Sequence, residues 1–309
     1  MDLTFHLKLR WSGRGRIRID YCFVEFEFLM LLRARYVKSL VRVPGRDIHI
    51  YGILHERSNG KGSAEEAARA VVMLNPRQVM LEIDEARFAS TLEHLKRGMN
   101  MSEPSRSDIV SNVHGGLLTR ELKLAVEAAK SIGAAVYLID RPHRITQNRV
   151  ARSILHPVSF ANLFKYGAMS LEARKTLKSP EEVKQLTDFL EENCPGVHRV
   201  LITERNEFMA SQINAESSEK TLVICGASHV PGLTELLSSP ELLKNVDLTE
   251  ITRKGVTLWP LVILLYLVIP VSIAGWVWFA GVRVVLKHLR KALGIPDLQD
   301  TQKKQANLM

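Results

Sequence analysis

The C-terminal part of the sequence contains a stretch, residues 256–282, in which 27 consecutive residues carry no charged side chain. A helix of about 20 apolar residues spans the hydrocarbon core of a bilayer, so this stretch is long enough to cross one. Trp259, Trp276 and Trp278 lie toward its two ends, and basic residues flank it on both sides, as is typical of membrane helices. The alternative, a buried core helix, is usually shorter. We therefore predict a transmembrane helix over 256–282.

Two segments outside the main domain bear on how the chain meets a membrane. Residues 283–309 follow the predicted span and form a basic tail. Residues 1–42 are also basic; Glu25 and Glu27 interrupt their apolar run of about 12 residues, which is too short to span a bilayer and lacks the cleavage site of a signal peptide. We expect residues 1–42 to be an extra strand or a disordered extension, and the chain to be tail-anchored with its main domain facing the cytosol.

The main domain, residues 43–251, alternates between strand-like and helix-like patterns. Strand-like segments show period-two alternation or a short apolar run. They are 47–53, 78–83, 134–140, 220–226 and, as a last strand, 246–251. Helix-like segments are 63–74, 84–96, 117–133, 145–193, 197–214 and a short one after His229. This alternation predicts an α/β domain with a mostly parallel or mixed sheet and helices on both faces.

Charge and cysteine content exclude two classes of protein. The formal net charge of +9 first suggests a nucleic-acid partner. The sequence has no stripe of Lys and Arg interleaved with aromatic residues and no finger or RNP-type signature, so we expect no nucleic-acid binding. Its three cysteines are scattered and odd in number, which argues against a disulfide framework and indicates a reducing compartment.

Ionisable residues gather at the predicted strand ends. In an open parallel sheet, ligands collect beyond the carboxyl ends of the strands. The first strand ends at Gly52 and is followed by His55, and the fourth ends at Gly226 and is followed by His229, so each forms a Gly-x-x-His motif. A glycine at such a position lets the backbone turn sharply or a ligand approach closely. The other two strand ends deliver Glu82, and Asp140 with Arg141.

Two histidines and one carboxylate from different strands suit a divalent metal ion. Neutral imidazole and carboxylate are ligands for zinc, manganese or iron, and three protein ligands leave one coordination position open. His55, Glu82 and His229 are therefore candidate metal ligands, although a histidine at a strand end can simply be hydrogen-bonded. Arg87 lies three residues after Asp84 and can instead form a local helix pair.

Five blocks of sequence, in order along the chain, resemble the TraB family, which is related to the Tiki proteins and more remotely to ChaN-like and erythromycin-esterase-like proteins. The blocks are "IHIYGILHERS", "RQVMLEIDEARF", "AVEAAKSIGAAVYLIDRPHRIT", "LITERNEFMASQI" and "LVICGASHVPGL". The resemblance covers about residues 43–251, and the C-terminal apolar segment resembles the anchor of eukaryotic TraB-domain proteins.

The resemblance implies a function and a ligand set. Tiki proteins are regarded as metal-dependent proteases that use two Gly-x-x-His motifs and a glutamate, which match His55, Glu82 and His229. The metal implied is Mn, Co, Zn or Fe, with a peptide or protein as substrate. The same resemblance implies that further groups orient the substrate or support the metal ligands. These groups are Arg87, Asp140, Arg141, Glu204 and Arg205. From the sequence alone, Glu204, Arg205 and Glu207 also fit an exposed helix face.

The first motif departs from the family pattern. The family usually has Gly-Thr-x-His followed by small or apolar residues, whereas Ile53 stands here in place of threonine and Glu56 and Arg57 follow the histidine. Three hypotheses about function therefore stay open. The first is a metal-dependent hydrolase of the peptidase type, the second is a non-enzymatic adaptor or tether that binds a partner protein, and the third is metal or haem handling without turnover. The resemblance places such proteins at the mitochondrial outer membrane, with the endoplasmic reticulum as the alternative; the oligomeric state stays open.

Overall fold

The computed structural model describes residues 8–12, 16–20, 40–53, 63–96, 120–173, 180–217 and 219–293. The chain divides into two compact units, Met1–Val256 and Thr257–Met309. The first unit is an α/β domain and the second contains an apolar helix, so the predicted fold class is confirmed.

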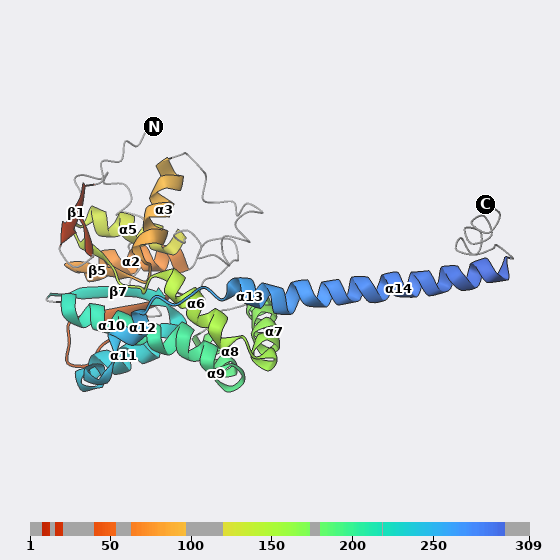
Figure 1. The fold of residues 1–309 in the computed structure, drawn as a ribbon. Coiled ribbons are helices and arrows are strands. Elements are labelled where there is room, and N and C mark those ends of the chain that lie inside the picture. Colours follow the sequence, from red (N-terminus) through yellow and green to blue (C-terminus); the bar gives the residue numbers. More distant parts are fainter. Residues whose placement is uncertain are drawn as a thin grey trace. The chain divides into compact units, whose positions relative to one another are not determined.

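A seven-stranded mixed sheet forms the centre of the first unit (Figure 1). Its strand order is β1-β2-β6-β5-β7-β4-β3. The strands are β1 (Lys8–Ser12), β2 (Arg16–Asp20), β3 (Leu40–Arg42), β4 (Ile48–Ile53), β5 (Gln78–Leu81), β6 (Ala135–Leu138) and β7 (Thr221–Gly226). The four central strands, β6, β5, β7 and β4, are parallel, while β3 pairs antiparallel with β4 at one edge. At the other edge β1 and β2 form an antiparallel pair, and β2 meets β6.

The register of the parallel strands aligns their carboxyl ends. Ile53 of β4 pairs with Gly226 of β7, and Leu81 of β5 pairs with both Ile224 and Leu138. The pairing continues one residue further, since the Glu82 N–H donates to the Ile224 carbonyl at 3.0 Å. The residues that follow β4, β5, β6 and β7 therefore meet at one edge of the sheet.

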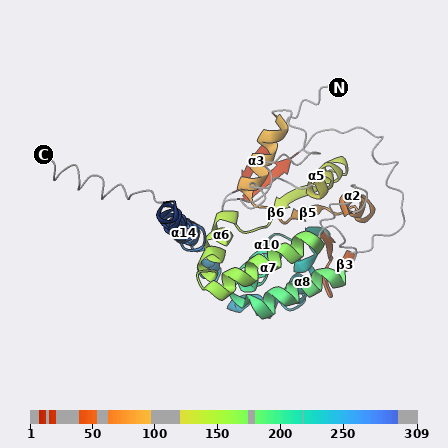
Figure 2. The same ribbon diagram turned by 90° about the vertical axis from the view of Figure 1, so that its right-hand side faces the viewer.

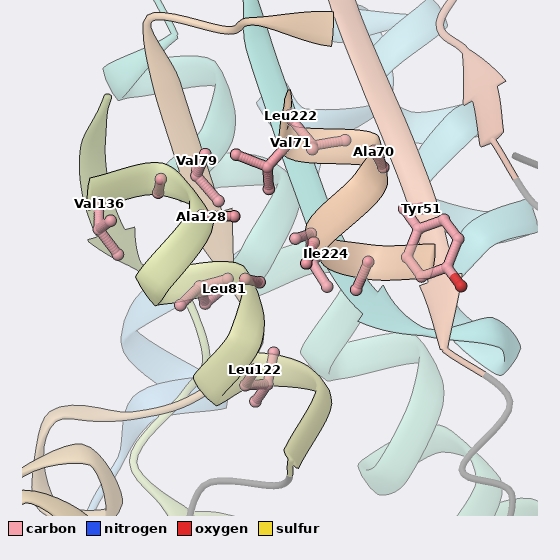
Figure 3. Packing of buried hydrophobic residues seen from close by; sticks show 14 of the residues in the cluster. Tyr51, Ala70, Val71, Val79, Leu81, Leu122, Ala128, Val136, Leu222 and Ile224 are labelled. Atoms are coloured by element: carbon pink, nitrogen blue, oxygen red, sulfur yellow. The ribbon is translucent and has the colours of Figure 1, made fainter. Parts of the chain in front are cut away.

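Each face of the sheet packs against its own pair of helices. Val79, Leu81 and Leu222 point to one face, where they meet α2 (Ser63–Leu74) and α5 (Arg120–Ser131), as Figure 3 shows. The contact between α2 and α5 is rich in buried alanines, which allow the two helices to approach closely. They are Ala67, Ala68, Ala70, Ala125, Ala128 and Ala129. The residues between them in sequence, such as Met80 and Val223, point to the opposite face.

The opposite face is covered by α10 (Glu204–Glu216) and α11 (Val230–Ser238), which lie across the sheet from α2 and α5 (Figures 1 and 2). The period-two alternation of the strands thus divides the core into two clusters. Gly133 follows the end of α5 with a φ of +71°, a left-handed conformation that favours glycine.

The remaining helices follow the predicted pattern with one exception. They are α3 (Glu85–Lys96), α6 (His143–Ser153), α7 (Pro157–Ala173), α8 (Pro180–Asn193), α9 (Pro195–His198), the 3-10 turns η2 (Ala227–His229) and η3 (Pro240–Asn245), and α12 (Leu248–Thr252). The predicted last strand over 246–251 is wrong, because these residues include most of α12. Asp247 caps this helix, and its Oδ1 accepts hydrogen bonds from the backbone N–H of Thr249 at 2.9 Å and of Glu250 at 3.1 Å. This local cap outweighs the strand-like alternation.

The second unit contains a helix that is long and apolar enough to cross a membrane. It consists of α13 (Trp259–Ile263), the π-helical turn η4 (Leu264–Val268) and α14 (Ile269–Ala292). The candidate span, Trp259–Leu289, has 31 residues and a mean hydropathy of 2.3. Its length and composition agree with the predicted span, although the helix extends beyond residue 282.

Gly52 in β4 gives a test of how the domain packs. A Cβ atom at this position would lie 2.8 Å from Val230 Cγ2 and 3.1 Å from the Cα of Ala227, which is backbone and cannot turn away. We expect Gly52→Ala to lower the free energy of unfolding of the full chain by about 1–3 kcal/mol, as overpacking does. Urea denaturation in detergent micelles measures this change. Gly167→Ala in α7 is the matched control, because its Cβ would meet nothing within 4 Å; an equal loss in both variants would contradict the packing role of Gly52.

Candidate functional site

Six charged or titratable side chains gather at the edge of the sheet where the parallel strands end, and we call this group the strand-end cluster. Its members are Glu82, Asp84, Arg87, Asp140, Arg205 and His229. Glu82 directly follows β5, Asp140 follows β6, and His229 ends the turn η2 after β7. The strand register therefore brings together residues that lie up to 147 positions apart in the sequence.

Arg87 joins the start of α3 to the end of β6. Asp84 caps α3, since its Oδ1 accepts hydrogen bonds from the backbone N–H of Ala86 at 3.1 Å and of Arg87 at 3.2 Å. The guanidinium of Arg87 forms ion pairs with Asp84 and Asp140. Arg87 is thus more than the partner of a local helix pair, because it also fixes Asp140 from another strand.

Arg205 of α10 lies at the centre of the cluster. Its Nε donates to Asp140 Oδ1 at 3.0 Å and its Nη2 donates to Asp140 Oδ2 at 2.8 Å, so the two side chains pair in a bidentate manner. The same Nη2 also forms an ion pair with Glu82, and Nη1 lies 3.1 Å from His229 Nε2. One guanidinium therefore bridges the ends of β5, β6 and β7.

Asn206 fixes the orientation and tautomer of His229. His229 Nδ1 lies 2.7 Å from the amide oxygen of Asn206, which only accepts hydrogen bonds, so Nδ1 carries a proton. Arg205 Nη1 only donates, so the nearby Nε2 presents its lone pair. Glu82 Oε1 lies 3.3 Å from Nε2 and could pair with an imidazolium. In an imidazolium, however, Nε2 would also carry a proton, and its N–H would point at the N–H of Arg205 Nη1. We therefore assign the neutral imidazole with the proton on Nδ1.

The charges of the cluster keep its carboxylates ionised. Burial alone would raise the pKa of Glu82, but the Arg205 guanidinium and a 2.6 Å hydrogen bond from the Gly226 N–H hold that pKa below its usual range. Burial would likewise raise the pKa of Asp140, and Arg205 and Arg87 lower it instead. Burial favours the neutral form of Arg205, yet Asp140 and Glu82 raise its pKa further above the ordinary value.

Arg141 and Glu204 belong to a second, buried cluster beside the first. The Arg141 side chain is 0% exposed, and its Nη1 donates to Glu204 Oε2 at 2.7 Å and to the Ile251 carbonyl at 2.9 Å. Arg149 Nη2 pairs with Glu204 Oε1 at 2.7 Å. The exposed helix face considered for Glu204 and Arg205 is wrong, because their side chains are only 2% and 15% exposed. Because no surface of Arg141 is accessible, its side chain cannot contact a substrate in this conformation.

The other candidate residues have separate positions. His55 lies outside the described residues, as do Glu56 and Arg57. Gly226 contributes its backbone N–H to Glu82, and the close packing of Gly52 against Ala227 and Val230 positions the end of β4 against the turn that carries His229.

One residue of the site, Asn206, was not predicted from the sequence. It orients His229, and an asparagine directly after the Glu204-Arg205 pair is its only local signal. His143, which follows the third predicted strand, begins α6 beside the cluster, and its Nε2 is buried without a hydrogen-bond partner among the described residues. Burial and the neighbouring charge of Arg87 lower the pKa of His143 to about 4, so its imidazole is neutral near pH 7.

The two described donors fit a divalent cation, with Arg205 as a competitor. Glu82 Oε1 and His229 Nε2 lie 3.3 Å apart, and the hydrogen bond from His229 Nδ1 to an amide oxygen is the support that metal-binding histidines commonly have. Arg205 already contacts both atoms. Within the described ranges no group of three His, Cys, Asp or Glu side chains is arranged to hold a metal ion, so a complete site would need His55.

The buried pair Arg141–Glu204 gives a test of the second cluster. We expect Arg141→Met to lower the free energy of unfolding by about 3–5 kcal/mol, because it removes one partner of a buried ion pair. Arg77→Met is the control: Arg77 is 80% exposed and lies 3.8 Å from Glu219, so the loss should stay below about 1 kcal/mol. Chemical denaturation of both variants measures the difference, and similar losses would contradict a structural role for the buried pair.

Comparisons with known proteins agree with the resemblance seen in the sequence. Residues 118–245, which include Asp140, Arg205 and His229, match the model of the TraB/PrgY/gumN family. An uncharacterized protein of Methanocaldococcus jannaschii is 26% identical over 250 residues, and the match covers 72% of this chain. The chain spans 62% of the length of that curated relative. Over residues 118–245 the chain is therefore similar to the TraB/PrgY/gumN family.

Proposed function

We propose that the chain is a membrane-anchored, metal-dependent hydrolase of the peptidase type. The observation that carries the proposal is the pair formed by Glu82 Oε1 and His229 Nε2, 3.3 Å apart at the carboxyl ends of two adjacent parallel strands. Asn206 turns the lone pair of Nε2 toward Glu82. His55 is the proposed third ligand; it lies two residues after the end of β4, the other neighbour of β7.

The cluster supplies the electrostatic environment that hydrolysis of an amide or ester requires. A divalent cation bound there would polarise a substrate carbonyl and lower the pKa of water. Arg87 and Arg205 are cations with side chains 19% and 15% exposed, so they can orient a substrate and stabilise negative charge on its carbonyl oxygen. Asp140 binds both arginines and therefore acts as a positioning residue.

Arg205 must move before a cation can lie between Glu82 and His229. Its Nη1 and Nη2 contact both proposed ligands, and a guanidinium and a divalent cation would repel each other at that distance. Asp140 would still hold the guanidinium of Arg205 after it has moved, because Asp140 already binds Nε and Nη2 of Arg205. Cation binding and the withdrawal of Arg205 are therefore coupled in this proposal.

A second candidate function is an adaptor or tether without catalysis. The ion pairs of Glu82 and Asp140 with arginines favour it, because the same contacts also stabilise the fold. Neighbouring residues of α6 hold the segment that precedes the apolar helix. Arg149 Nη1 donates to the Glu250 carbonyl at 3.1 Å, and Asn148 Nδ2 donates to the Gly255 carbonyl at 3.3 Å. Capture of a partner protein that survives His229→Ala would favour this function over hydrolysis.

The proposed location is the mitochondrial outer membrane, with the α/β domain in the cytosol. The support for a membrane is the 31-residue apolar helix, and the organelle rests on the resemblance to eukaryotic TraB-domain proteins. The endoplasmic reticulum is the alternative. A tag at the N-terminus and protease treatment of isolated organelles distinguish these locations. The proposal requires that the tagged chain is found on mitochondria and that protease added from outside removes the tag.

The metal content of the purified full chain tests the proposed function. We expect the wild-type chain in detergent micelles to bind one Mn²⁺, Co²⁺, Zn²⁺ or Fe²⁺ per chain after dialysis. His229→Ala and His55→Ala should each lower the affinity at least about 100-fold, because a directly bound ligand contributes more than the roughly 10–100-fold of its supporting partner. His156→Ala, at an exposed position, is the control. A folded wild-type chain that binds no divalent cation would overturn the hydrolase proposal.

Arg205→Met tests the competition between the guanidinium and the cation. Removal of the positive charge should raise the affinity for the divalent cation at least about tenfold, a change of about 1.4 kcal/mol. Isothermal titration with Mn²⁺ or Zn²⁺ measures the change, and Arg77→Met controls for loss of an exposed arginine. Unchanged or weaker binding in Arg205→Met would show that Arg205 does not occupy the position of the cation.

A further inference from the structure

A cavity of about 770 Å³ lies between α8 and α11, beside the strand-end cluster. Ligand sites in proteins commonly have volumes of about 300–1,000 Å³. Asn206 lines the cavity and also bonds His229, and Ala227 and Ser228 line it directly before His229 in sequence. The cavity therefore shares a wall with the proposed active site.

The walls of the cavity combine apolar side chains with carboxylates. The apolar lining residues include Val183, Ile202, Val230, Leu236, Leu242 and Val246. Four carboxylates also line the cavity against one ammonium group, although the whole chain has a formal net charge of +9. The ammonium group, Lys184 Nζ, is already paired with Asp188 at 2.7 Å. The cavity is thus locally acidic in a basic protein.

Glu207 is the carboxylate that most needs a positive partner. It lies half-buried on α10, and burial together with the nearby Glu204 raises its pKa. Among the described residues it has no hydrogen bond or salt bridge through its side chain, whereas its sequence neighbours Glu204, Arg205 and Asn206 all do. Glu181 and Glu235 face the same cavity, and their side chains likewise have no ion pair within the part of the chain that the structure describes. A cation bound there would therefore meet three carboxylates.

We propose that this cavity binds a peptide segment in which a lysine or arginine lies among apolar residues. The apolar walls accept the neighbouring side chains, and Glu207 pairs with the ammonium or guanidinium group. That the bound peptide is also the substrate rests on the proposed hydrolase function, because the shared wall at Asn206 and Ser228 would place the peptide next to His229. The binding itself does not require catalysis.

Two matched peptides test the proposal on the full chain in neutral-lipid nanodiscs. The first is fluorescently labelled acetyl-Leu-Lys-Leu-amide, and the second is the same peptide with Nε-acetyl-lysine, which keeps the alkyl chain of lysine and removes its charge. We expect the lysine peptide to bind at least about tenfold more tightly. Glu207→Gln should abolish this difference, whereas Glu192→Gln, on the exposed part of α8 outside the cavity, should preserve it. Empty nanodiscs correct for binding to lipid.

Equal affinities for the two peptides, or a difference that survives Glu207→Gln, would overturn the proposal. The His229→Ala variant separates it from the proposed function. If that variant keeps the preference for the lysine peptide while the wild-type chain binds no metal, the cavity proposal stands and the hydrolase proposal fails. If the wild-type chain binds metal but shows no preference between the peptides, the opposite holds.

Discussion

The contacts of Arg205 hold the ends of three parallel strands together. Parallel strands bring their carboxyl ends to one edge of a sheet, and here that edge receives the carboxylates of Glu82 and Asp140. Two like charges repel strongly where little water is present. The Arg205 guanidinium of α10 pairs with both, and Arg87 also pairs with Asp140. The Arg205 contacts join the helix layer of one sheet face to the strand ends.

Neighbouring residues of α10 connect two clusters. Arg205 points to the strand ends, while Glu204 accepts from Arg141 and Arg149. The turn that leads into α10, η1 (Arg199–Thr203), is π-helical, a conformation that is frequent at functional sites. Arg141 and Arg149 also hold backbone carbonyls of α12, the last helix before the apolar one. A continuous set of charged contacts therefore runs from the strand ends to the segment that precedes the apolar helix.

Local sequence patterns predicted the fold well. The site was harder to predict, because its side chains pair with residues that are distant in the sequence. Period-two alternation identifies β4, and the helix-like segments 63–74 and 117–133 identify α2 and α5, because these signals act within a few residues. The rule that ligands meet at strand ends also correctly groups Glu82, Asp140 and His229. Burial of Glu204 and Arg141 could not be predicted, since it depends on partners from four separate segments. Residues 246–251 were misassigned because the cap by Asp247 competes with an alternating pattern.

The protonation of His229 is the most direct measure of how the strand-end cluster is arranged. Nitrogen NMR of the full chain with ¹⁵N-labelled histidine, assigned with His229→Ala, reports which ring nitrogen carries the proton. The hydrogen bonds to Asn206 and Arg205 require a proton on Nδ1 and a bare Nε2 at neutral pH in the metal-free protein. A proton on Nε2, or a fully protonated ring, would contradict the arrangement in which Nε2 and Glu82 can both bind a cation once Arg205 withdraws.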